Sequence, residues 1–487
     1  MLFNSVIFIA VFLPIALTGW FLLNRLKKPF YAKAFLTGMS LWFYGYYNLS
    51  YLWILLGSIF FNYGVSCLLT RTDRSGGRRR LLGMGLAGNL GLLFYYKYFN
   101  FFVDNCNFFF HGNIVVEEIL LPLGISFFTF QQLSYLAERY RGTIAHGSFW
   151  DYSCFISFFP QLVAGPIVLY QEFVPQLQSP GVRRPSWDSL YDGFSLFILG
   201  LAKKVLLADT LAVVVNAEFD NILYLDALSA WAVVFFFVFE LYFDFSGYSD
   251  MARGLGRMFG FRLPENFNAP LTAVSVKDFW RRWHMTLSRF LMTYIYFPLG
   301  GNRKGKARQC LNLAVVFLVS GIWHGASWNF VLWGCIHGLA VVWETIFPKV
   351  RFRWKAANQL VTGIFLALAW VPFRCATLSD TVLLWRKLFA GGYTGMFAGI
   401  CNQLQLAENY AVRKFLEIAA PQYVNLFYML NYTVLLGICV ILVTREKAEV
   451  WIAEKGRTAR GTFCMATLFT WSFISLSQVS IFLYFNF

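Results

Sequence analysis

Histidine changes charge near neutral pH, so it is the first residue type to examine for acid–base chemistry. The sequence contains five histidines, at His111, His146, His284, His324 and His337. An ionisable group within or beside an apolar run is a functional candidate, because keeping it in lipid is costly. This criterion selects His324 and His284. We interpret His337 as packing between helices, and the other two fall in predicted loops.

His324 ends an apolar run, within the stretch Gly321–Asn329, which reads GIWHGASWN. Its flanking glycines allow close backbone approach, and Trp323 and Trp328 can wall a cavity. In such a dry pocket a neutral imidazole could take the proton of a hydroxyl that attacks an acyl carbonyl. A structural histidine bonded to a neighbouring helix fits the same position.

His284 lies in a segment of mixed tryptophan and arginine. Periodicity predicts one amphipathic interfacial helix over 277–289, which leads into a membrane span and turns three arginines toward water or headgroups. Its apolar face would carry Trp280, Trp283, His284 and Leu287. A surface anchor without chemistry is the alternative interpretation.

Two acids, Asp244 and Asp250, lie in the motif DFSGYSD, within or beside an apolar run. Buried acids need partners, and we expect Arg253, Arg257 or a histidine to supply them. A structural ion pair is the favoured interpretation, and a role in the site is the alternative.

Other site chemistries lack support in the sequence. There is no HExxH motif, no close histidine pair and no GxSxG motif, so we expect neither a metal site nor a serine nucleophile. The nine cysteines show no CxxC pair and are interpreted as small buried hydrophobes. We expect no bound cofactor.

The composition is that of a membrane protein. Of 487 residues, 58% are hydrophobic, 20% are aromatic and only 14% are charged, too few to cover a soluble surface. The net charge of +16 falls in short bursts between apolar runs, such as Arg71–Arg80, Arg281–Arg289 and Arg351–Lys355. This pattern favours a lipid bilayer as partner and the basic clusters as its cytoplasmic face, and it argues against nucleic acid.

The elements that must position these residues are helices. Several of the apolar runs are shorter than the ~20 residues that cross a bilayer. Between about 150 and 290 they are broken by prolines and glycines, which indicates re-entrant segments. We predict an outer loop with an amphipathic piece over Thr377–Gln422. Candidate spans are Leu2–Leu23, Ala34–Asn48, Leu52–Leu69, Leu81–Tyr96, Ile119–Leu136, Leu190–Ala202, Leu228–Phe245, Leu287–Leu299, Leu311–Trp323, Phe330–Ile346, Leu360–Val371, Asn425–Val443 and Phe463–Phe485.

Several motifs, in order, resemble the membrane-bound O-acyltransferase family, in its bacterial alginate O-acetyltransferase branch. The similarity covers residues 1–375 approximately. Its motifs are PLGISFFTFQ from Pro122, PQLVAGPI from Pro160, DFSGYSDMA from Asp244, NFNAP from Asn266, and the segments Trp283-His284 and Trp323-His324-Gly325.

The resemblance implies an all-α polytopic protein, with about 11–13 tilted transmembrane helices and re-entrant or interfacial helices around a central funnel or tunnel. It implies one domain over 1–487, in which 376–487 form an outer loop and the last two transmembrane helices. His324 would be catalytic, with His284 as the second site residue. We expect Trp323, Trp283, Asp244, Asp250 and Asn329 to line the substrate path.

The predicted activity is transfer of an acyl group, most simply acetyl, across the membrane for O-acetylation of a secreted or cell-surface polysaccharide. The donor would be cytoplasmic acetyl-CoA or an acyl carrier thioester. The resemblance implies a bacterial plasma (inner) membrane, a periplasmic or extracellular acetyltransferase partner and polysaccharide export machinery. The alternatives are D-alanyl or other acyl transfer from a carrier protein to a cell-wall polymer, and a non-enzymatic export component.

Overall fold

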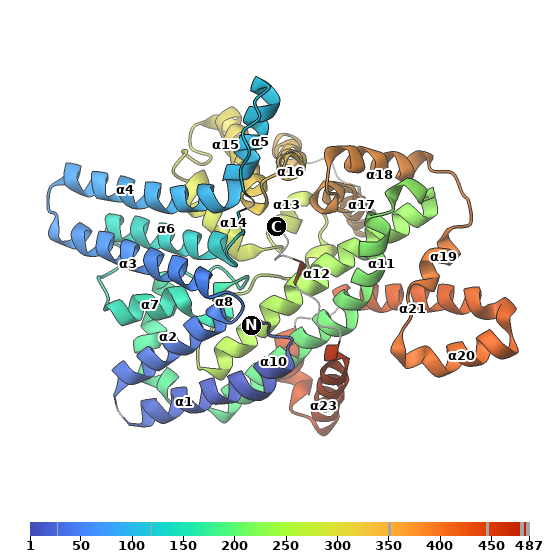
Figure 1. Ribbon diagram of the computed structural model, residues 1–487, viewed down its shortest axis with the longest axis horizontal. Coiled ribbons are helices and arrows are strands. Elements are labelled where there is room, and N and C mark those ends of the chain that lie inside the picture. Colours follow the sequence, from blue (N-terminus) through green and yellow to red (C-terminus); the bar gives the residue numbers. More distant parts are fainter. Residues whose placement is uncertain (27, 118, 349–351, 445–447, 478–481, 484–487) are drawn as a thin grey trace. The chain divides into compact units, whose positions relative to one another are not determined.

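The computed structural model describes residues 1–26, 28–117, 119–348, 352–444, 448–477 and 482–483. Their regular elements are all helical, and no strand occurs among them (Figure 1). Arg351 and the last residues of the predicted span Phe463–Phe485, at 478–481 and 484–485, lie outside the described residues.

Six of the described helical segments are long and apolar enough to cross a bilayer, which supports a polytopic membrane protein. They are Phe8–Arg25, Leu49–Arg71, Ala227–Met258, Trp328–Ile346, Lys355–Arg374 and Pro421–Thr444. Ala227–Met258 is α12, a helix of 32 residues that extends well past the predicted span Leu228–Phe245. Most of α12 is buried, so it belongs to the protein interior more than to the lipid-facing surface.

The chain groups into two compact units. The first unit comprises Met1–Gly200, Tyr248–Glu265 and Ile452–Phe485, and α3, α4 and α6 lie side by side in it (Figure 1). Its helices are α1 Leu13–Arg25, α2 Pro29–Gly45, α3 Leu49–Arg71, α4 Ser75–Leu93, α5 Phe99–Phe110, α6 Ile125–Arg141, α7 Phe149–Ser157, α8 Phe159–Leu162, α9 Tyr170–Gln178, α23 Ala459–Ile474 and nearly all of α10 Trp187–Ala202.

The second unit comprises Leu201–Gly247 and Asn266–Trp451, and it contains His284 and His324. It takes α12 as far as Gly247. Its other helices are α11 Asp209–Phe219, α13 Val276–Trp280, α14 Met285–Leu291, α15 Gly305–His324, α16 Trp328–Ile346, α17 Lys355–Arg374, α18 Leu378–Ala390, α19 Phe397–Asn402, α20 Tyr410–Ala419, α21 Val424–Thr444 and α22 Ala448–Trp451.

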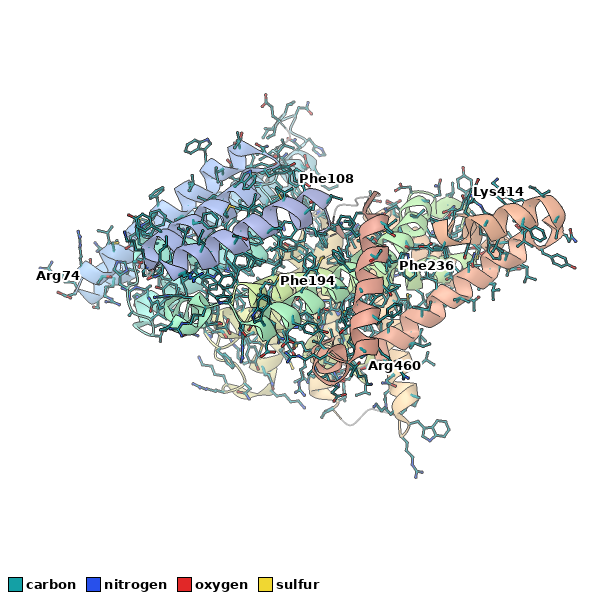
Figure 2. The ribbon with its side chains drawn as sticks, turned by 90° about the horizontal axis from the view of Figure 1, so that it is seen from below. Arg74, Phe108, Phe194, Phe236, Lys414 and Arg460 are labelled. Atoms are coloured by element: carbon teal, nitrogen blue, oxygen red, sulfur yellow. The ribbon has the colours of Figure 1, made fainter. Side chains whose placement is uncertain are left out.

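The predicted outer loop over Thr377–Gln422 is largely helical. It forms α18, α19 and α20, and the Thr377 side chain begins α18 by accepting the backbone N–H of Asp380. The predicted amphipathic piece corresponds to α20, where Lys414 and Glu417 pair on the surface. Figure 2 shows Lys414 on α20, which packs beside α21.

Candidate active site

A tightly packed helical hairpin, α15 followed by α16, positions His324. A Cβ atom at Gly321 would lie 2.3 Å from the carbonyl oxygen of Phe330, and one at Gly334 would lie 2.6 Å from that of Phe317. Only glycine fits at these two positions, because the helix backbones touch there. Gly321 in the GIWHG stretch therefore serves the packing of the hairpin.

His324 is the last residue of α15 and is 5% exposed. Its ring lies 5.0 Å from that of Trp333 and 5.3 Å from that of Phe373, centroid to centroid, in edge-to-face contacts. These rings and the neighbouring Trp323 enclose the imidazole in apolar surroundings that largely exclude water.

His284 lies at a break between two short helices, so the predicted continuous helix over 277–289 is wrong. Helix α13 ends at Trp280, His284 adopts a left-handed conformation with φ 44° and ψ 52°, and α14 begins at Met285. The break is stabilised by backbone bonds to a distant segment: Asn268 N–H donates to the Arg282 carbonyl at 2.9 Å. Helical periodicity carries no information about that segment.

A hydrogen-bond network fixes the tautomer of His284. The Asn266 Oδ1 atom accepts from the Thr286 N–H at 3.2 Å and from its hydroxyl at 2.9 Å. His284 Nδ1 lies 3.1 Å from the same oxygen, so Nδ1 must carry the proton and donate it. Nε2 then holds a lone pair, which meets no hydrogen-bond donor among the described residues. Complete burial lowers the pKa of His284 to about 3, so the ring is neutral at physiological pH.

The structure brings His284 and His324 together. Their ring centroids are 6.4 Å apart, and Trp323 lies 6.2 Å from His284. Phe245 of α12 packs edge-to-face against His284 at 4.8 Å. Trp283 turns to the neighbouring aromatic cluster, 5.0 Å from Trp370. Two buried imidazoles with aromatic walls form a site able to accept, hold and release one proton.

Asn329 contacts the chain just after α17, whose end also packs against His324. Its Nδ2 donates to the Cys375 carbonyl at 2.6 Å, and Phe373, two residues earlier, packs against His324. The Asn329 Oδ1 atom is buried without a hydrogen-bond partner among the described residues. This polar atom is available to a bound substrate.

The two acids of the DFSGYSD motif have different partners. Asp244 lies 2.6 Å from Lys204 Nζ, and Lys204 also lies 2.7 Å from Asp209. Lys204 is not among the partners expected from the sequence. Asp250 belongs to the first unit and pairs with Arg253 at 3.8 Å, one of the expected arginines.

Comparison with known proteins decides the family. The family model for membrane-bound O-acyltransferases matches residues 92–378. The chain belongs to the membrane-bound O-acyltransferase family. It is 35% identical to a peptidoglycan O-acetyltransferase of Helicobacter pylori, over 100% of this chain and 98% of the relative. It is 36% identical to a probable alginate O-acetylase of Pseudomonas aeruginosa, over 80% of this chain and 75% of the relative.

A more distant relative matches about half of the chain. The teichoic acid D-alanyltransferase of Bacillus subtilis is 27% identical over 52% of this chain and 66% of its own length. The family and these relatives confirm that the chain is an O-acyltransferase and a multi-pass membrane protein with bacterial relatives. The roles of single residues stay predictions.

Sequence reasoning missed Lys204 and Glu344. Lys204 belongs to the basic pair Lys203–Lys204, a pattern that predicts a charged membrane face, yet its side chain is 2% exposed. Glu344 of α16 accepts the backbone N–H groups of Val276 at 2.7 Å and Lys277 at 3.0 Å, and so holds the start of α13. His337 lies two turns earlier on α16 and accepts from Trp280 Nε1 at 3.3 Å, consistent with the expected packing role. No local sequence signal links Lys204 or Glu344 to its partners.

Proposed function

We propose that this enzyme is an O-acetyltransferase that moves an acetyl group from a cytoplasmic thioester to a hydroxyl of a polysaccharide outside the membrane. The observation that carries the proposal is the pair of buried imidazoles, His284 and His324, 6.4 Å apart within aromatic walls. Membership of the O-acyltransferase family and the two O-acetyl-transferring relatives support the same chemistry.

In the proposed step, His324 acts as general base. It removes the hydroxyl proton while the hydroxyl oxygen forms a bond to the acyl carbon. The carbon–sulfur bond then breaks, and the proton on His324 passes to the leaving thiolate. His284 stays neutral, because burial holds its pKa at about 3. Its Nε2 lone pair accepts a hydrogen bond and thereby orients the hydroxyl or the donor.

The rest of the proposed arrangement concerns passage across the membrane. We infer a ring of about 11–13 tilted helices around a funnel in the plasma (inner) membrane of a bacterium. The broken segments α7, α8 and α9 and the largely buried α12 support this, since irregular backbone at membrane depth needs protein or a cavity around it. A periplasmic or extracellular acetyltransferase and export machinery would complete the pathway.

A cell-wall glycan is the acceptor to test first. The peptidoglycan O-acetyltransferase of H. pylori matches this chain along its whole length, whereas the alginate O-acetylase of P. aeruginosa matches 80% of it. The D-alanyl alternative rests on a relative that covers 52% of the chain.

The test is transfer of isotope-labelled acyl groups, with the label on the acyl group of each donor, in membrane vesicles that contain the export machinery. Acetyl-CoA, an acetylated carrier protein and a D-alanyl carrier protein are supplied in turn, and ester-linked label in glycan is measured by mass spectrometry. The proposal predicts acetyl esters on glycan with an acetyl donor. Label only from the D-alanyl carrier, or glycan export without thioester cleavage, would contradict it.

A further inference from the structure

A cleft of about 400 Å³ opens beside the segment that leads to His284. One wall contains Thr272, Val274, Asp278 of α13 and Arg282, and the other is formed by the start of α17 and the residues just before it. Its charged lining residues are Asp278, Arg282, Arg353 and Lys355. The proposed catalytic step uses none of these four residues.

The cleft is a built feature, because side chains of α17 tie both walls in place. Asn358 donates to the Phe352 carbonyl at 2.8 Å and accepts the Phe352 N–H at 3.0 Å. Gln359 donates to the Thr272 carbonyl at 2.8 Å. These bonds hold the basic start of α17 against the other wall.

The lining carries excess positive charge. Three cations and one carboxylate leave a net charge of +2. Asp278 is already engaged, by Arg282 at 2.8 Å and by the Val274 N–H at 3.1 Å. Neither Arg353 nor Lys355 has an ion-pair partner among the described residues. The free N–H groups at the start of α17 add to the positive potential, so the cleft suits phosphate groups.

Size and position indicate a small anionic ligand. Small-molecule pockets have volumes of about 300–1,000 Å³, and the cleft falls within this range. A docked carrier protein would instead cover about 800 Å² of surface on each partner. Arg282 lies two residues before His284, so their Cα atoms are at most about 7 Å apart. A ligand in the cleft would thus lie next to the segment that carries the site histidine.

We propose that this cleft is a phosphate-binding site and that it holds the phosphate groups of a nucleotide thioester donor. This rests on the proposed function and identifies the donor as acetyl-CoA itself. A second source of phosphate is an anionic lipid headgroup, since Phe352 and Trp354 are exposed at the rim, as aromatic residues are at membrane interfaces.

The first experiment measures binding of adenosine 3′,5′-bisphosphate, a fragment of CoA, by calorimetry in phosphatidylcholine nanodiscs. The double variant Arg353→Ser/Lys355→Ser should raise the Kd at least about tenfold, because two charge-assisted contacts are lost. The matched variant Arg303→Ser/Lys304→Ser removes two exposed cations of the same unit that do not line the cleft. Its Kd should stay within about twofold of wild type.

The second experiment compares donors in the transfer assay. Arg353→Ser/Lys355→Ser should raise the KM for acetyl-CoA by the same factor as the Kd and leave kcat unchanged. The KM for acetyl-pantetheine, which has no phosphate, should not change. Equal bisphosphate binding by wild type and variant, or use of an acetylated carrier protein alone, would overturn the proposal.

Lipid binding and failure of the proposed function give distinct results. If wild type does not bind the bisphosphate, and the double variant instead co-purifies with less phosphatidylglycerol, the cleft is a lipid site and the proposal is wrong. If the bisphosphate binds as predicted but no donor supports transfer, the cleft is a phosphate-binding site and the proposed acetyltransferase function is wrong.

Discussion

Replacing Asn266 by alanine should disable the site without touching either histidine. The Oδ1 atom of Asn266 accepts from His284 Nδ1 and from both the amide and the hydroxyl of Thr286. Leaving a buried donor unsatisfied costs about 1–3 kcal/mol. The Thr286 hydroxyl can rotate to another acceptor, so two donors remain and the expected loss is about 3 kcal/mol.

The expected effect on the reaction is larger than the effect on folding. With no acceptor at Nδ1, the His284 proton is no longer confined to that nitrogen, and the Nε2 lone pair is lost in part of the molecules. Loss of such an orienting group typically costs 10–100-fold. We therefore expect acetyl transfer to fall about 10–100-fold, while thermal unfolding shifts down by only about 3 °C in a chain of this size.

Thermal unfolding and single-turnover transfer in nanodiscs measure the two effects separately. The matched control is Thr286→Val, which removes one hydroxyl bond to Asn266 and leaves the bond of His284. The control should keep activity within about threefold, because its cost is limited to one hydrogen bond. Wild-type transfer by Asn266→Ala, or an equal loss in both variants, would refute the reasoning.

Three further perturbations follow from the same contacts. The pKa of His284 is about 3 against an ordinary 6.5, because burial disfavours its charged form. Neutral His284 therefore contributes fully to stability above about pH 6.5, and the free energy of unfolding falls by about 1.4 kcal/mol per pH unit as the pH drops toward 3. The unfolding midpoint of His284→Gln should show a shallower pH dependence over this range than that of wild type. Lys204→Met should destabilise by about 3–5 kcal/mol in denaturation, since Asp209 and Asp244 lose their cation, and neutralising both acids should restore stability. Gly321→Ala should lower the free energy of unfolding by about 1–3 kcal/mol in denaturation, because its Cβ would meet the Phe330 carbonyl oxygen. Gly363→Ala, where a Cβ meets open space in a helix, should raise it by up to about 1 kcal/mol.

Composition and motif order were sufficient to predict the class of protein. The scarcity of charge indicates a membrane protein, and the ordered motifs indicate the acyltransferase family, which the comparisons confirm. His284 and His324 were both selected because ionisable groups beside apolar runs are costly. Their proximity could not be derived from spacing, since forty residues separate them and the approach depends on how the hairpin of α15 and α16 packs.

The errors come from long-range contacts. Helical periodicity predicted one helix through His284, but backbone bonds from the segment at Asn266 and Asn268 hold a left-handed turn there. The burial of Lys204 could not be predicted, because its partner Asp244 lies forty residues ahead on another helix. Local pattern reports the periodicity of a segment, and it does not report which distant polar group will meet it.

The most direct test of the account is the single-turnover rate of acetyl transfer by His324→Gln, with wild type and His146→Gln, an exposed histidine of the first unit, as references. Unfolding midpoints of the same preparations establish that each variant is folded. The account predicts a loss of at least about 100-fold for His324→Gln, the usual contribution of a general base, and no loss for His146→Gln. A folded His324→Gln protein that transfers acetyl groups at the wild-type rate would contradict it.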